Sequence, residues 1–186
     1  MEILSKQIVV QSKSLDEIQR MALDKEVLLS AIPSIQPINN ENLRRMASGY
    51  GWRTDPFTKS RRMHKGMDFS APTGTPIYAP SDGKVIRVDS RSAGYGKHIR
   101  IEHGFGYVTL YAHLSEYNVR RGQRVKRGDV IGFVGNTGRS VAPHLHYEIR
   151  KDGKHLNPIN FYYGDLNTEE FNALLEAANR ENQSLD

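Results

Sequence analysis

The feature that most constrains the fold is a series of short apolar runs, separated by turn signals, between residues 81 and 153. Glycine-containing turns such as Ser81-Asp82-Gly83 and Asn136-Thr137-Gly138 divide this stretch, and no helical pattern interrupts it. The runs predict strands over residues 84–88, 97–102, 107–112, 130–134 and 145–149. Because closely spaced strands without crossover helices pair antiparallel, we expect a mainly β protein of the α+β class, built on an antiparallel sheet or sandwich.

A helical segment is predicted before these strands. Ser14 and Glu17 have the spacing of a capping box, and an apolar stripe with the period of a helix follows them. A second, short helix is predicted over residues 41–47. We therefore expect residues 1–48 to form a helical accessory or stalk segment.

Another helical pattern follows the strands. Asn167 and Glu170 form a cap signal, and apolar residues at positions 171, 174, 175 and 178 recur at the period of a helix. The tail from Glu181 is polar. These boundaries predict a main domain over residues 49–163, followed by a C-terminal helix and tail over residues 164–186.

Composition narrows the chemistry that is available to the chain. None of the 186 residues is cysteine, which excludes disulfides, thiol catalysis and cysteine-ligated metal sites. Any metal must therefore be held by His, Asp or Glu. The 26 basic and 21 acidic residues give a net charge of +5, which suits an anionic partner as well as simple solubility. No apolar run approaches the ~20 residues of a membrane span, and no signal peptide is visible.

Two histidine motifs could carry chemistry. His64 and Asp68 form an H-x-x-x-D pattern, and His144 and His146 form an H-x-H pattern within a predicted strand. Because residues i and i+2 of a strand project from the same face, His144 and His146 should lie side by side. Two histidines and one carboxylate are a known ligand set for catalytic zinc. A structural histidine pair and a surface ion pair remain the alternatives for each motif taken alone.

The order and spacing of several sequence blocks resemble the lysostaphin-type (LytM-like) zinc metallopeptidases of peptidase family M23, which cut peptidoglycan peptides. The resemblance covers residues 49–163. The blocks are SGYGWRTDP at 48–56, HKGMDFSAP at 64–72, GTPIYAP at 74–80, GYVTLYAHL at 106–114, GFVGNTG at 132–138, PHLHYE at 143–148 and LNP at 156–158.

The resemblance implies roles for five residues. His64, Asp68 and His146 would bind one Zn²⁺ per chain, and His113 and His144 would be the catalytic histidines that flank the attacking water. The implied activity is zinc-dependent hydrolysis of peptide bonds in peptidoglycan stem peptides or cross-links. Which of the two catalytic histidines acts as the general base stays open.

Other readings compete with the enzyme. Degenerate relatives serve as binding modules that activate a partner cell-wall hydrolase, but all five positions are filled here. A lipoyl-type carrier needs a modifiable lysine on an exposed hairpin, and Lys126 lacks that context. No nucleic-acid-binding pattern is present, so the basic run at 120–127 is expected to be a solvated face or a contact with an anionic polymer or membrane.

The resemblance also implies where the protein works. Peptidoglycan lies outside the cytoplasm, so we expect an extracytoplasmic location, in the periplasm or cell envelope. Since no signal peptide is visible, we expect the chain to be a truncated form of a longer protein that is membrane-anchored or exported.

Overall fold

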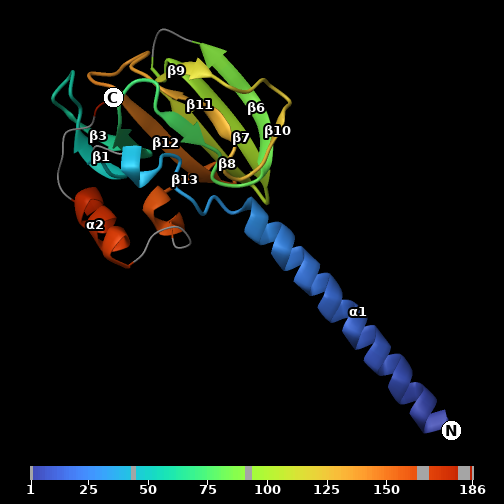
Figure 1. Ribbon diagram of the computed structural model, residues 1–186. Coiled ribbons are helices and arrows are strands. Elements are labelled where there is room, and N and C mark those ends of the chain that lie inside the picture. Colours follow the sequence, from blue (N-terminus) through green and yellow to red (C-terminus); the bar gives the residue numbers. More distant parts are fainter. Residues whose placement is uncertain (1, 43–44, 91–93, 163–167, 180–184, 186) are drawn as a thin grey trace. The chain divides into compact units, whose positions relative to one another are not determined.

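The computed structural model describes residues 2–42, 45–90, 94–162, 168–179 and 185. It divides into two compact units, Met1–Ser30 and Ala31–Asp186. The first unit is formed by helix α1 (Glu2–Ala31), whose last residue belongs to the second unit (Figure 1). Of the helices that the structure describes, none combines the length and the apolar character that crossing a membrane requires.

The predicted N-terminal helix is confirmed, but its predicted start is wrong. α1 begins at Glu2, so Ser14 and Glu17 lie within continuous helix and cap nothing. The apolar side chains of its stripe, such as Leu15 and Ile18, are exposed.

The second unit is built around an antiparallel sheet that has eight strands within the described ranges. The strand order is β1-β4-β12-β8-β7-β6-β10, and β13 also pairs with β12 (Figure 1). The strands are β1 (Arg45–Ser48), β4 (Met67–Ser70), β6 (Gly83–Ser90), β7 (Lys97–Gly104), β8 (Tyr107–Ala112), β10 (Arg124–Val125), β12 (His144–Lys151) and β13 (Lys154–Leu156).

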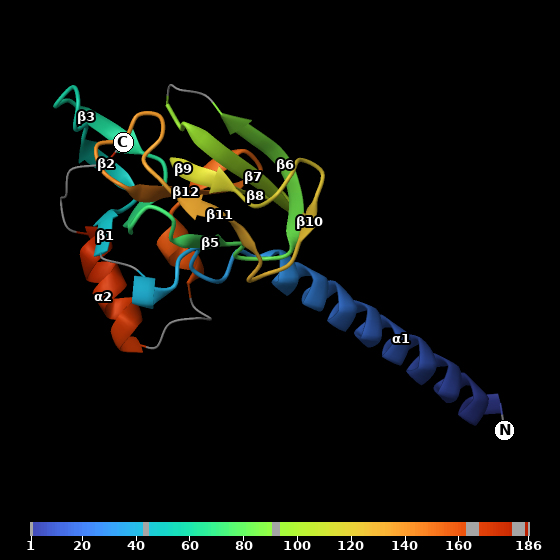
Figure 2. The ribbon, with the colours of Figure 1, turned by 45° about the horizontal axis from the view of Figure 1, so that its top comes forward.

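A smaller sheet, in the order β5-β11-β9, packs against one face of the large sheet (Figure 2). Its strands are β5 (Pro76–Tyr78), β9 (Leu114–Tyr117) and β11 (Val130–Val134). A separate hairpin consists of β2 (Gly51–Thr54) and β3 (Arg61–His64). The remaining elements are the 3-10 helices η1 (Asn40–Asn42) and η2 (Pro158–Phe161) and the helix α2 (Thr168–Asn179), which lies beside β1.

The mainly β, antiparallel architecture with helices at both ends is therefore confirmed, and so are all five predicted strands. The helix predicted over 41–47 is wrong. Asn40–Asn42 form a 3-10 turn, and Arg45–Ser48 form a strand that pairs with β4. Pairing with an exposed sheet edge satisfies the backbone and overrides a weak local helix preference. Residues 43–44 lie outside the described part.

The C-terminal helix is confirmed from Thr168, whereas the predicted cap residue Asn167 and most of the tail lie outside the described residues. Leu174 is buried in the core, and Leu175 is exposed. The boundary between the compact units falls after Ser30, and Ile38 belongs to the core of the second unit.

Strand alternation separates the core from the opposite face of the large sheet. On β12, Leu145, Tyr147 and Ile149 point into the hydrophobic core. The rings of Tyr147 and Tyr111 lie 5.3 Å apart there, and the core continues into the small sheet through Ile131. The residues between them on β12 project from the other face. That face carries the histidines.

Candidate metal centre

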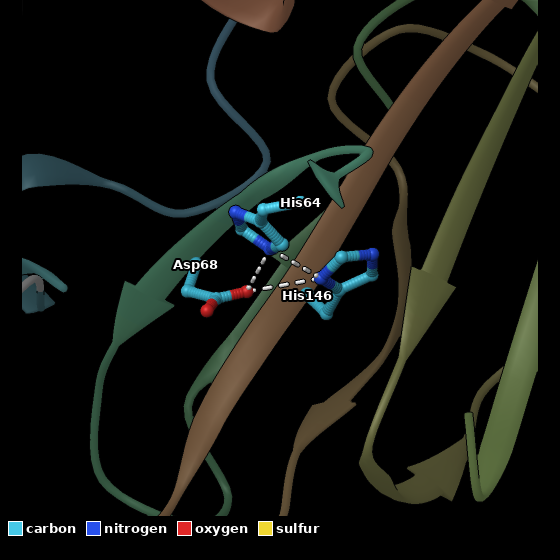
Figure 3. A group of neighbouring side chains, drawn as sticks. All are labelled: His64, Asp68 and His146. Carbon is cyan, nitrogen blue, oxygen red and sulfur yellow. Dashed lines mark hydrogen bonds and ion pairs between the residues drawn. The ribbon is translucent and has the colours of Figure 1, made fainter. Parts of the chain in front are cut away.

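Three ligand-type atoms converge on the face of β12 opposite the core. Nε2 of His64 lies 3.1 Å from Oδ1 of Asp68 and 3.1 Å from Nδ1 of His146, and Nδ1 of His146 lies 2.9 Å from Oδ1 of Asp68 (Figure 3). All three side chains are buried. Ligands of a tetrahedral zinc ion with bonds of about 2.0–2.1 Å are roughly 3.3 Å apart, so this triangle has the size of a metal site.

Backbone pairing brings these residues together. His146 and Asp68 are directly opposite each other in the register of β12 and β4, and they share a face. His64 ends β3, four residues before Asp68, and the turn between them returns its ring to the same place. The structure thus brings these three residues together, and their binding of a metal ion stays a prediction.

The rings of His64 and His146 are each oriented by a hydrogen bond on the side that faces away from Asp68. Nδ1 of His64 lies 2.7 Å from the carbonyl oxygen of Gly49, and Nε2 of His146 lies 3.2 Å from Oε1 of Glu148. Because each of these nitrogens must donate its N–H to an oxygen, the other nitrogen carries a lone pair. Both lone pairs face the Asp68 carboxylate, and three acceptors in one place call for a cation. An outer acceptor for each histidine is the arrangement found around bound metals.

Asp68 is ionised at this position. Burial opposes its charge, but protonated His64 and His146 outweigh burial and hold the pKa of Asp68 well below its usual range when no metal is bound. A metal cation facing the neutral rings would favour the carboxylate in the same way. Its second oxygen, Oδ2, accepts a hydrogen bond of 3.2 Å from the main-chain N–H of Leu185. The carbonyl of Leu185 in turn accepts from the N–H of Val141 at 3.0 Å. Oδ1 is therefore left facing the two histidines.

Two further histidines lie beside the cluster. The rings of His113 and His144 are 4.7 Å apart, and that of His113 is 6.1 Å from the ring of His146. Nδ1 of His113 donates to the carbonyl of Thr137 at 2.7 Å, and Nδ1 of His144 donates to the carbonyl of Ala142 at 2.8 Å. In each ring, Nε2 is thus the nitrogen with the lone pair.

His113 adopts a strained backbone conformation. It connects β8 of the large sheet to β9 of the small sheet, with a φ of +62°. Residues other than glycine seldom adopt this left-handed conformation, and such strain is concentrated at functional sites.

Nε2 of His144 is buried, with no hydrogen-bond partner among the described residues, and it lies 3.8 Å from Oδ1 of Asp68.

Glu148 was not singled out from the sequence, although the i, i+2 pattern that pairs His144 with His146 extends to it. Its Oε1 also accepts from the hydroxyl of Tyr95 at 2.6 Å, and its Oε2 from Nη2 of Arg150 at 2.7 Å. Burial opposes the charge of Glu148, but the hydrogen bonds from His146 and its other partners keep its pKa well below the usual range. It is an anion that orients the ring of His146, one of the three convergent residues.

Tyr95 also lies at this site, where it lines the same cleft as His64 and His146. Its ring lies 5.8 Å from that of His146. Burial, reinforced by the negative charge of Glu148, raises the pKa of Tyr95 above its ordinary value. The phenol therefore stays a hydrogen-bond donor at neutral pH.

A cleft with a volume of about 360 Å³ opens over the cluster, and its wall is formed partly by the β2–β3 hairpin. The lining residues are Arg53, Asp55, Arg62, Met63, His64, Lys65, Gly94, Tyr95, His113, Arg139, His146 and Glu148. Asp55 is buried and accepts from Nη2 of Arg139 at 2.8 and 2.7 Å, which joins the hairpin to the loop before β12. Backbone N–H groups of Thr58 and Phe57, with burial opposing them, lower the pKa of Asp55.

The other three histidines of the chain, His98, His103 and His155, lie outside the cluster of His64, Asp68 and His146. His98 and His103 are buried and bonded to backbone or hydroxyl groups, which is typical of structural histidines. His155 lies 3.2 Å from Oε2 of Glu148, so it contacts the site only through that carboxylate. The basic run at 120–127 lies around β10 and does not line the cleft.

Comparisons with known proteins agree with this geometry. The DD-carboxypeptidase/endopeptidase Mpg of Neisseria meningitidis is 48% identical over 116 residues, which are 62% of this chain and 26% of Mpg. The peptidoglycan DD-endopeptidase ShyA of Vibrio cholerae is 46% identical over 108 residues, which are 58% of this chain and 25% of ShyA. The chain thus spans about a quarter of the length of these curated relatives.

A solved structure of a zinc-containing peptidase from Vibrio cholerae has the same fold. It matches with a TM-score of 0.61 and 38% identity, over 66% of this chain and 37% of that one. The model of peptidase family M23 matches residues 62–158, which are 97 of the 186 residues and include His64, Asp68, His113, His144 and His146. The chain belongs to peptidase family M23.

Proposed function

We propose that the chain is a zinc-dependent endopeptidase that hydrolyses peptide bonds in peptidoglycan stem peptides or cross-links, and that it works outside the cytoplasm. The observation that carries the proposal is the convergence of His64, Asp68 and His146 on one point, with two more histidines beside it. The name of the relative ShyA supports the substrate class, and the location follows from that substrate.

Zinc fits the donor set. His64 Nε2, His146 Nδ1 and Asp68 Oδ1 supply two neutral imidazoles and one carboxylate, with the other atoms of each ligand held by Gly49, Glu148 and Leu185. Three protein ligands leave one position of a tetrahedral ion for water or substrate, as in other catalytic zinc sites. When bound, zinc would lower the pKa of a water molecule towards ~7 and polarise the scissile carbonyl.

His113 and His144 would handle the protons. The Nε2 atom of each ring can accept a proton, because the Nδ1 atom already donates to a main-chain carbonyl. One of the two rings takes the proton of the attacking water at Nε2 and gives it to the leaving amine. The other, when protonated, donates from Nε2 to the carbonyl oxygen as negative charge develops there.

The test is digestion of purified peptidoglycan by the zinc-loaded chain, with and without a chelator, followed by mass spectrometry of the released muropeptides. We expect new peptide ends that appear only without chelator, and the product masses identify the bond. The matched variant is His146→Ala, which should lose both zinc and cleavage. One tightly held zinc ion without any cleavage would contradict the enzymatic proposal and favour a binding module that activates a partner hydrolase.

A further inference from the structure

The charged side chains that are accessible at the surface of the cleft are positive. Its two wall carboxylates are engaged: Asp55 accepts from Arg139 and from two backbone N–H groups, and Glu148 accepts from Tyr95, His146 and Arg150. Asp68 is fully buried within the metal cluster. Of the hairpin cations that line the cleft, Arg62 and Lys65 are exposed and Arg53 is half-buried.

Three of these cations form what we call the basic wall: Arg53, Arg62 and Lys65. Arg53 on β2 is directly opposite Arg62 on β3 in the hairpin register. Like charges directly opposite each other across two strands destabilise the pair, so an anion between them would relieve repulsion. Asp55 compensates only in part, since its Oδ2 lies 3.5 Å from Nη1 of Arg62, whose side chain is 59% exposed.

The basic wall is adjacent to the metal ligands in the chain. Arg62 precedes His64 by two residues on β3 and therefore projects from the same face of that strand. Two strand residues span roughly 7 Å, which is also the length of about two residues of an extended peptide. A carboxylate held by Arg62 would thus belong to a substrate residue within one or two positions of the bond over the metal ligands.

From this arrangement we propose that the basic wall is a specificity site for a free carboxylate of the substrate peptide, next to the scissile bond. The inference rests on the proposed function and narrows it. Cross-links that carry a carboxylate at this place, such as those between D-alanine and diaminopimelate, are then preferred over uncharged bridges such as polyglycine. Arginine suits the task because its planar fork matches a carboxylate.

The experiment uses two synthetic cross-linked peptides that differ only in whether the diaminopimelate carboxylate beside the D-alanyl bond is free or amidated. For the zinc-loaded chain, we expect kcat/KM to be at least about 10-fold higher for the free acid, the size of one hydrogen bond to a charged group. The preference should appear mainly in KM and should shrink in high salt, which screens exposed charges.

Substitutions test which residues cause the preference for the free acid. Arg62→Gln and Lys65→Gln should each reduce the ratio of free acid to amide, and the double variant should bring it close to one. Arg62→Lys keeps the charge and should retain part of the preference. The matched controls Arg124→Gln and Lys126→Gln change exposed cations on the far basic run and should leave the ratio as in the unmodified chain. Thermal melting of each variant checks that the hairpin still folds.

Two results would overturn the inference: equal kcat/KM for both peptides in the unmodified chain, or a preference that survives in the double variant. If neither peptide is cleaved, the proposed function fails, and calorimetric titration of the zinc-loaded protein with the same two peptides still decides the matter. Tighter binding of the free acid, lost in the double variant, would support the basic wall independently of turnover. Equal binding of both peptides would refute it.

Discussion

Glu148 accepts a hydrogen bond from the ring of His146 on the side away from Asp68. Oε1 of Glu148 lies 3.2 Å from Nε2 of that ring, and Nδ1 of the ring faces Asp68. The two residues are two positions apart on β12 and therefore share a face of the strand. The carboxylate fixes which nitrogen carries the proton and makes the other a better donor to a metal. We therefore predict that Glu148 positions His146 as a metal ligand.

Glu148→Gln should weaken zinc binding by about 10–100-fold, the usual effect of losing such an outer partner. The amide can still accept a hydrogen bond from His146, but it lacks the charge that strengthens the ring as a ligand. Competition with a chromogenic chelator measures the affinity. Glu116→Gln, an exposed carboxylate on β9, is the control and should bind zinc like the unmodified chain. Equal affinities for the Glu148→Gln and control proteins would count against this role.

The role of His113 in turnover can be tested apart from zinc binding by a substitution that is compatible with its backbone conformation. Asparagine tolerates a positive φ better than alanine, so His113→Asn removes the imidazole with less strain at φ +62°. We expect zinc to remain bound, because the ring of His113 is not one of the three convergent ligands. Turnover should fall by roughly 10²–10⁴-fold, as for the loss of one acid–base group.

Metal content by mass spectrometry and the rate of muropeptide release measure these two properties separately. A His113→Asn protein that cuts at the unmodified rate would show that this histidine has no acid–base role. A protein that has lost its zinc would instead make His113 part of the metal site.

The sequence was sufficient for the parts of the fold and site that depend on local alternation. The H-x-H pattern placed His144 and His146 on one face of a strand, and Leu145 and Tyr147 on the other, as the structure has them. The predicted strands were also right, because β-rich runs between glycine turns leave few other conformations.

What the sequence missed depends on contacts between distant residues. Asp55 and Arg139 are 84 positions apart, and nothing local indicates that they meet. The strand at Arg45–Ser48 exists because an edge of β4 is there to pair with it. The capping-box spacing of Ser14 and Glu17 is a coincidence of the local sequence, because the helix extends through both residues. Local signals cannot report such partners.

Gly96 sets the distance between two loops at the site. A Cβ atom there would lie 2.4 Å from the carbonyl carbon of Thr137 and 2.5 Å from its oxygen, the oxygen to which His113 donates. Gly96→Ala must therefore displace Thr137 and with it the ring of His113. We expect lower stability and reduced turnover, measured by urea unfolding and muropeptide release.

The control for this substitution is Gly74→Ala. Gly74 also has a positive φ, of +90°, but nothing lies within 4 Å of its Cβ position. Both variants bear the cost of the left-handed backbone, and only Gly96→Ala adds a collision. If the two variants were equally active, the approach of Gly96 to Thr137 would not matter for the site.

His103 gives the fold a pH dependence of its own. It is a buried residue of β7, with Nε2 2.7 Å from Oγ1 of Thr109 and Nδ1 2.8 Å from the carbonyl oxygen of Asp82. Burial lowers the pKa of His103 from 6.5 to about 4. The unfolded chain therefore binds a proton between these values when the folded chain does not. The contribution of His103 to the free energy of unfolding should be level above about pH 6.5, fall as the pH drops towards 4, and level off below.

Linkage sets the size of this effect at about 3 kcal/mol between pH 7.5 and pH 4. Urea unfolding of chelator-treated protein at both pH values measures it, with His103→Gln as the reference. The variant keeps the metal-site histidines and every other acid, so their titration cancels in the comparison. It should lose about 3 kcal/mol less than the unmodified chain over the same range, even though it starts from a lower stability at pH 7.5. Equal losses in the two proteins would mean that His103 takes up its proton in the folded state as readily as in the unfolded one.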